Sequence, residues 1–436
     1  MNKKTVIGCV SVLGLSAIYL AGVYHSGKEA DNFIEKAVEQ AQLQSEGQGI
    51  IRSEAKTGFY SSHYTLVYTP EELPEGAQEW MGGRDIPFDL EVKHGFLNAE
   101  STLTLAEGNL LTKLKSFQAD ADDEPFVMEL QQSFSPLSSQ LVMDGEFESA
   151  KFIVKSEEGT ATIGAIEMTF DQEGRDFSLD LEMQDSVVDT QEFKLSVKGI
   201  NGTESGRLDH DDPLQAVMAE TVDALFNIEN ILVESDQYNV EANGLRLEVQ
   251  QRLDEGRMLM SIGYAADSVH VVEVGKTAPA FTDLNLKLSF DLDYAATRDL
   301  AIMLQGMQSD PQVMQQQMEG MIVVADGVTE KGIGADINDL SMGWNGHKAQ
   351  GEAALDIAPF QVSEIMARPD QIREYLTLDA QFSAPAAMLE AMPDYDPQQI
   401  ELFVQMGFVQ KLDDTYKVEL QLKEGVATLN GQAVPM

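Results

Sequence analysis

Apolar and polar side chains alternate along most of the chain, and this period of two predicts β-strands. The purest case is residues 284–294, where every second residue is Leu, Phe or Tyr. The same alternation recurs over residues 145–199, with short turns such as 171–174 between the runs. Short turns join antiparallel strands, and alternation means that one face of a sheet is packed and the other is wet.

Several stretches instead place apolar residues at a period near 3.6, which predicts helices. In one of them Pro213 stands at a favoured first-turn position behind an Asp cap, and Leu214, Val217 and Leu225 share a face. The stretches expected to be helical are 27–44, 213–225, 295–308, 311–325, 361–367, 371–375 and 385–409, the last one broken at 393–397.

Residues 5–24 carry no charge and follow Lys3 and Lys4. As a helix they would reach roughly 30 Å, the thickness of the bilayer's hydrocarbon core. A cleaved signal peptide is the alternative, but it has a shorter apolar core and a small-x-small cleavage site. The pattern therefore predicts an uncleaved anchor with a cytoplasmic N-terminus. The residues assigned to the anchor are Thr5, Val6, Ile7, Leu13, Leu15, Ile18, Leu20 and Tyr24.

Together these elements predict the α+β class: an N-terminal transmembrane helix followed by a large exported domain dominated by antiparallel sheet, with inserted helices on one face or end. The expected division is 1–26 for the cytoplasmic end and anchor, 27–48 for an amphipathic helix, and 49–436 for the β-rich domain.

The charge is strongly acidic, with 73 Asp and Glu against 29 Lys and Arg and a formal net charge of −44. This excludes nucleic acid as a partner, because DNA and RNA binding needs basic phosphate contacts. The acids are scattered singly, which favours a solvated surface over a dedicated site for cations or basic partners. The one cysteine, Cys9, lies in the apolar segment, so the exported part has no disulfide.

Motifs for catalysis or metal binding are missing from the chain. The six histidines have no metal-ligand spacing, and no nucleophile elbow, phosphate-binding loop or dinucleotide fingerprint occurs. Ser62 and His63 are adjacent in an expected strand, so they point to opposite faces and are poorly placed as nucleophile and base. No catalytic residue, metal ligand or cofactor is expected, and the protein is predicted not to be an enzyme.

Short motifs at both ends resemble the YdgA-like family of Gram-negative envelope proteins, a domain of unknown function. They are TGFYSS at 57–62, VKHGFL at 92–97, FVQMGFVQK at 403–411 and GVATLNGQAVP at 425–435. This chain has Thr57 where the family usually has a basic residue and Phe96 where it usually has Pro. The resemblance implies a single-pass inner-membrane protein with its C-terminal domain in the periplasm, and it implies no activity, cofactor or catalytic residue.

Three functions remain open at this point. The preferred one is a non-enzymatic structural or interaction protein of the envelope. The first alternative is a protein that binds lipid or another apolar ligand in a groove of a curved sheet, and the second is an unrecognised hydrolase. Expected partners are the inner membrane, through the N-terminal helix, and envelope proteins or lipid; the oligomeric state stays open. The candidate groove residues are Leu286, Phe290, Met303, Met314 and Met318.

Overall fold

The computed structural model describes residues 49–57, 61–73, 76–94, 98–120, 123–134, 141–210, 216–276, 278–307, 322–392 and 395–434. These residues form two compact units. Unit 1 is built from the described residues of 49–191, 199–219 and 304–307, and unit 2 from those of 192–198, 220–303 and 322–434.

Unit 1 is an antiparallel sheet in which β1 pairs with β2 and each following strand pairs with the next as far as β6. Strand β6 then pairs with β9, β9 with β10, and β10 with β12, while β8 pairs with both β7 and β11. The strands are β1 (Gly49–Thr57), β2 (Ser61–Pro70), β3 (Ile86–His94), β4 (Asn98–Leu105), β5 (Phe126–Phe134), β6 (Leu141–Ser149), β7 (Phe152–Lys155), β8 (Gly159–Ile163), β9 (Ile166–Glu173), β10 (Asp176–Met183), β11 (Ser186–Thr190) and β12 (Phe193–Leu208), whose residues 193–198 belong to unit 2.

One face of β2–β6 forms the core of unit 1. Leu90, Val92, Leu130 and Met143 are at most 1 % exposed there, because alternate residues of neighbouring strands point to the same side. Leucines of the helix α4 (Asn109–Phe117) pack on this cluster, and the short helix α3 (Ala77–Met81) precedes β3. This face is therefore covered and closely packed.

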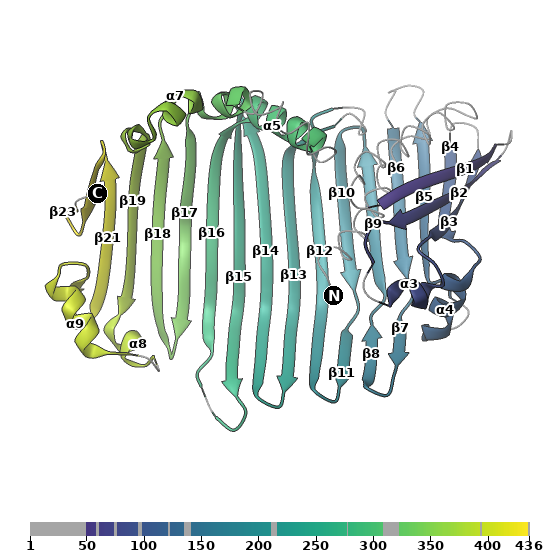
Figure 1. Ribbon diagram of the computed structural model, residues 1–436, viewed down its shortest axis with the longest axis horizontal. Coiled ribbons are helices and arrows are strands. Elements are labelled where there is room, and N and C mark those ends of the chain that lie inside the picture. The colour runs from purple at the N-terminus through teal and green to yellow at the C-terminus, as the bar shows by residue number, and fades with distance from the viewer. Residues whose placement is uncertain are drawn as a thin grey trace. The chain divides into compact units, whose positions relative to one another are not determined.

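Unit 2 is an antiparallel meander in which each strand from β13 to β19 pairs with the next (Figure 1). After β19 the chain leaves the sheet for two helices and returns in β21, which pairs with β19, β20 and β22. The strands are β13 (Ala219–Ser235), β14 (Tyr238–Asp254), β15 (Arg257–Glu273), β16 (Phe281–Asp293), β17 (Ile333–Trp344), β18 (His347–Ile357), β19 (Leu376–Pro385), β20 (Gln410–Leu412), β21 (Thr415–Lys423), β22 (Val426–Leu429) and β23 (Gln432–Val434).

The helices of the second half of the chain lie at the ends of strands. Figure 1 shows α5 and α7 along the upper ends of the strands of unit 2, and α8 and α9 at the lower ends of β19 and β21. Helix α9 begins at Pro397, and the Asp396 side chain caps it by accepting from the N–H groups of Gln398 and Gln399. The helices are α5 (Tyr294–Met307), one over 322–329, α7 (Val362–Ala367), the 3₁₀ helix η1 (Pro369–Glu374), α8 (Ala386–Glu390) and α9 (Pro397–Gln405).

The helix expected at 213–225 is wrong for the residues described there. Residues 219–225 open the strand β13, and Val222, Ala224 and Phe226 lie on one face of it at a period of two. Pairing with β14 satisfies the backbone and half-buries this face, which outweighs the weaker helical pattern. Residues 211–215 lie outside the described part.

The α+β class is also wrong. The described elements are mostly antiparallel strands, and the helices are short additions at strand ends. Among the residues that the structure describes, no helix combines the length and the apolar character needed to cross a bilayer. The expected anchor at 5–24 and the amphipathic helix at 27–48 lie outside the described residues. By contrast, the strand expected at 284–294 is confirmed by β16 as far as Asp293, and Tyr294 begins α5.

Candidate functional site

One side of β13–β19 and β21 is apolar along successive cross-strand rows, and we call this side the apolar face. Residues that oppose each other in antiparallel strands point to the same side, so the register defines each row. The row through Phe290 contains Gln251 as its one polar member. The row through Leu286 runs Phe226, Leu247, Tyr264, Leu286, Leu340, Gly351, Phe382 and Val418.

A register shift in β17 keeps the apolar face continuous. Both Ile337 and Leu340 oppose leucines of β16, although they are three residues apart and would otherwise point to opposite sides. A β-bulge lets a strand re-aim its side chains in this way. The intervening Asn338 donates to Ser289 on the polar side of the sheet.

Large side chains in the middle of the apolar face are only partly buried, whereas Trp344 and Ala349 at its lower end are buried in a cluster with Met388 of α8. Tyr264, Leu340 and Phe382 are 49, 42 and 40 % exposed, and Leu286 and Phe290 are half-buried. Large apolar side chains inside a sheet normally pack against a second layer. Among the described residues, no such layer lies over the middle of this face.

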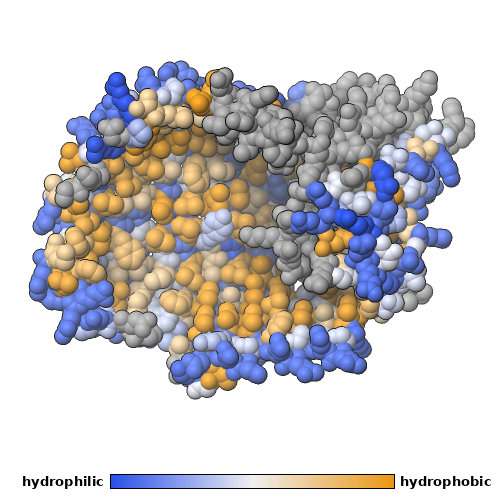
Figure 2. Space-filling view, viewed as in Figure 1, coloured by the Kyte–Doolittle hydropathy of each residue, from blue (hydrophilic) through white to orange (hydrophobic). Residues whose placement is uncertain are grey.

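The apolar face encloses a hollow of about 740 Å³. Figure 2 shows hydrophobic residues gathered in a hollowed surface over β13–β21, between hydrophilic margins above and below. This volume lies in the range of pockets that bind small molecules, roughly 300–1,000 Å³. Its lining includes Phe226, Leu245, Leu247, Tyr264, Leu286 and Phe382.

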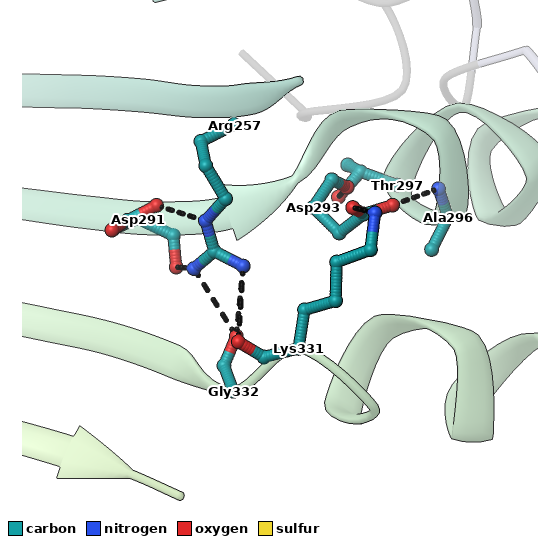
Figure 3. Close-up of polar contacts among 7 residues, drawn as sticks. All are labelled: Arg257, Asp291, Asp293, Ala296, Thr297, Lys331 and Gly332. Atoms are coloured by element: carbon teal, nitrogen blue, oxygen red, sulfur yellow. Dashed lines mark hydrogen bonds and ion pairs between the residues drawn. The ribbon is translucent and has the colours of Figure 1, made fainter. Parts of the chain in front are cut away.

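A cluster of charged groups holds the upper ends of β15–β17 together (Figure 3). Arg257 Nε lies 2.6 Å from Asp291 Oδ1, and the same guanidinium donates to the carbonyl of Gly332 at 3.2 Å. Lys331 Nζ lies 2.5 Å from Asp293 Oδ2. These contacts join β16 to the segment that enters β17, although the two are far apart in the chain.

Asp293 also caps α5, because its Oδ1 accepts from the N–H of Ala296 at 2.9 Å. Burial alone would raise the pKa of Asp293. The hydrogen bonds from Lys331 and Ala296 and the charges of Lys331 and Arg257 outweigh burial and hold this pKa below its usual value. The cluster therefore fixes the start of α5 at the upper margin of the apolar face.

A polar row borders the apolar face toward the lower ends of β13–β16. Asn230, Asn243 and Ser268 oppose one another in register, two residues beyond Ile228, Leu245 and Ala266 on the same strands. Asn230 Nδ2 donates to Asn243 Oδ1 at 2.8 Å, and Asn243 Nδ2 donates to Ser268 Oγ at 3.2 Å. We call Asn230, Asn243, Ser268 and the neighbouring Glu241 the polar row.

The residues expected to line a groove are placed as follows. Leu286 lines the hollow, and Phe290 lies on the same face four residues further along β16. Met303 is half-buried in α5 and is not among the residues that line the hollow. Met314 and Met318 lie outside the described residues, as do all the assigned anchor residues. The polar row escaped sequence reasoning because its members are 13 and 25 residues apart.

The histidine and hydroxyl considered for hydrolysis do not meet. Ser62 is buried, whereas His63 points to the other side of β2 and lies 3.5 Å from Asp89. The nearby Thr65 hydroxyl donates to Asp89 rather than to the imidazole, so no nucleophile is paired with a base there. Within the described residues, no group of three or more His, Cys, Asp or Glu side chains could hold a metal ion.

Comparison with known proteins gives one match. A family model described as "Bacterial protein of unknown function (DUF945)" matches residues 1–436. No curated protein and no solved structure matches the chain.

Proposed function

Because that family model covers the entire chain, the protein belongs to this bacterial family of unknown function, and we propose that it is a non-enzymatic protein whose unit 2 binds the acyl chains of lipids. The observation that carries the proposal is the half-buried apolar face with its hollow of about 740 Å³. When a ligand covers the partly exposed Leu and Phe side chains, binding gains about 25 cal/mol for each Å² of apolar area removed from water.

The dimensions of the apolar face suit an acyl chain. Eight neighbouring strands at about 4.8 Å spacing make the face roughly 35 Å wide. An acyl chain occupies about half of the roughly 30 Å hydrocarbon core of a bilayer. A chain of this length can therefore lie across several strands without leaving the apolar face.

A lipid fits this face better than a protein partner does. The rows through Leu286 and Leu288 offer almost no side-chain donors or acceptors, whereas a protein interface carries a hydrogen bond for about every 100–200 Å². The surface is also hollowed rather than flat (Figure 2). A second copy of the chain is the competing occupant, and it would appear as a dimer in solution.

The proposal agrees with an envelope protein that works beside a membrane. Location in the inner membrane with a periplasmic domain, partner proteins of the envelope and the absence of enzymatic activity stay predictions. The acidic net charge of −44 repels anionic lipid surfaces, so uptake of lipid is expected to depend on the apolar face rather than on surface charge.

The test is lipid retention by the purified full chain. We expect native mass spectrometry and lipid extraction to find bound lipid with the wild-type protein. Leu286→Glu should lower the retained lipid at least about tenfold, because a carboxylate in an apolar site costs well over the 1.4 kcal/mol that a factor of ten represents. Lys287→Glu is the matched control, since Lys287 is exposed on the opposite side of the same strand.

Two results would overturn the proposal. One is equal lipid retention by Leu286→Glu and Lys287→Glu, with the same far-ultraviolet circular dichroism as the wild type. The other is a lipid-free dimer that Leu286→Glu converts to monomer, which would identify a second copy as the occupant.

A further inference from the structure

The polar row has the chemistry of a head-group site. It stands two residues, or about 7 Å, beyond the apolar lining of β13–β15, so a ligand in the hollow reaches it without leaving the sheet. Its amide and hydroxyl groups already form a chain of hydrogen bonds, which fixes their orientation.

Asn243 organises the row. Its Nδ2 donates to Ser268 Oγ at 3.2 Å and lies 3.4 Å from Glu241 Oε1, so both amide hydrogens are directed to neighbours. Ser268 Oγ accepts from Asn243, which leaves the hydroxyl hydrogen to donate to a ligand. The Glu241 carboxylate is exposed beside the Ser268 hydroxyl and can accept a hydrogen bond from a cationic group.

Among Asp, Glu, Lys and Arg, strands β13–β16 direct only acidic side chains to this side of the sheet. By register, β13–β16 direct Glu220, Glu234 and Glu241 to the same side as Leu245, and within these strands no Lys or Arg points there. Arg246 borders the hollow, but its side chain lies on the opposite side, with Nε 3.4 Å from Asn227 Oδ1. Lys194 of β12 reaches this side, but its ammonium pairs with Glu234 at 3.4 Å. Within β13–β16 a lone phosphate therefore finds no Lys or Arg partner.

We propose that the polar row binds the head group of a zwitterionic lipid that carries an ammonium group, with its acyl chains in the hollow. Glu241 pairs with the ammonium, and the Ser268 hydroxyl and the Asn230 amide bind the oxygens next to it. This inference rests on the proposed function and adds the orientation and the head-group class of the ligand.

The test uses the full chain and vesicles that contain equal amounts of phosphatidylethanolamine and phosphatidylglycerol with identical acyl chains. The protein is separated from the vesicles, and the two retained lipids are measured by mass spectrometry. We expect about fivefold enrichment of phosphatidylethanolamine, the upper range for a partly exposed ion pair. Glu241→Gln should bring the ratio close to one without lowering the total.

Glu248→Gln is the matched control, because Glu248 lies on the opposite side of β14 and also accepts from an amide two residues away, that of Gln250. A second variant, Asn243→Ala, should reduce the enrichment by releasing Glu241. The Glu248→Gln control should show the same enrichment of phosphatidylethanolamine over phosphatidylglycerol as the wild type.

The outcomes separate the two proposals. Retention of both lipids in equal amounts by the wild type, or an unchanged ratio in Glu241→Gln, overturns the head-group assignment and leaves acyl-chain binding intact. Retention of no lipid by the wild type overturns acyl-chain binding and the head-group assignment with it.

Discussion

Units 1 and 2 are built from the same kind of strand, yet their apolar faces end in different states. In unit 1, Leu130 and Met143 are at most 1 % exposed, and leucines of α4 pack on the cluster. In unit 2, Leu286 is half-buried and Tyr264 is 49 % exposed, because the helices lie at the ends of the strands. The alternation of side chains along a strand thus determines which side of the sheet is apolar. The position of the connecting helices determines whether that side is covered.

The two units also differ in how they treat carboxylates. On the outer side of unit 1, Asp144 of β6 directly opposes Asp171 of β9. Partial burial, together with the hydrogen bond and charge of Asp171, raises the pKa of Asp144. In unit 2, Asp293 has its pKa lowered by partners that donate to it. The two like charges of Asp144 and Asp171 repel each other in unit 1, whereas the ion pair of Asp293 with Lys331 stabilises unit 2.

The largest expected effect contrasts two leucines. Leu130→Ala should lower the free energy of unfolding by about 2–5 kcal/mol, because it leaves a cavity in a closed core. Leu286→Ala should cost roughly 1 kcal/mol or less, since the side chain already meets solvent. Urea unfolding of the full chain measures both, and equal losses would show that the apolar face is closed in solution.

An intermediate effect is expected at the start of α5. Asp293→Ala should lower the free energy of unfolding by about 1–2 kcal/mol, through loss of the helix cap and of the contact with Lys331. Asp293→Asn keeps a capping oxygen and should lose less. The difference between the two variants in urea unfolding at pH 7 separates the cap from the charge, and identical losses would contradict a role for the charge.

The contribution of Asp293 should also depend on pH. A carboxylate with a lowered folded pKa stabilises the fold above its unfolded pKa of about 3.9, and this stability is lost as pH falls through the folded value. The wild type should therefore lose its advantage over Asp293→Asn as the pH falls through that window. A constant difference in unfolding free energy from pH 7 to pH 3 would contradict the assignment.

The smallest effect is expected for the opposed carboxylates of unit 1. Asp144→Asn should stabilise the fold by roughly 0.5 kcal/mol or less at pH 7, because it removes one of two like charges in directly opposed positions. Since the folded chain binds this proton more tightly than the unfolded chain, wild-type stability rises as pH falls through the raised pKa, and the advantage of the variant shrinks. A gain that is as large at pH 3 as at pH 7 would contradict this explanation.

Much of unit 2 could be read from short stretches of the chain. The alternation of Leu284, Leu286, Leu288 and Phe290 predicted β16 and also singled out two residues of the apolar face. The same reasoning failed at 219–225, because Val217 and Leu225 fit a helical period while the strand pairing that overrides it comes from β14. Local patterns report which side chains share a face, but they do not include the partner strand.

The candidate site itself depends on pairing between strands whose residues are far apart in the sequence. Asn230, Asn243 and Ser268 carry no shared motif, and only the register of three strands aligns them. The hollow likewise depends on the bulge that keeps Leu340 on the same side as Ile337. Hydrogen-bond register is a property of paired strands, so no single stretch of sequence contains it.

The sequence by itself determined the acidic charge, the strand period and the two-sided character of each strand, because these follow from the order of residue types. The tertiary structure alone decided that one apolar face is closed by α4 and the other stays open around a hollow of about 740 Å³. The physical reason is that burial depends on which elements lie over a face, and elements far apart in the chain meet only after folding.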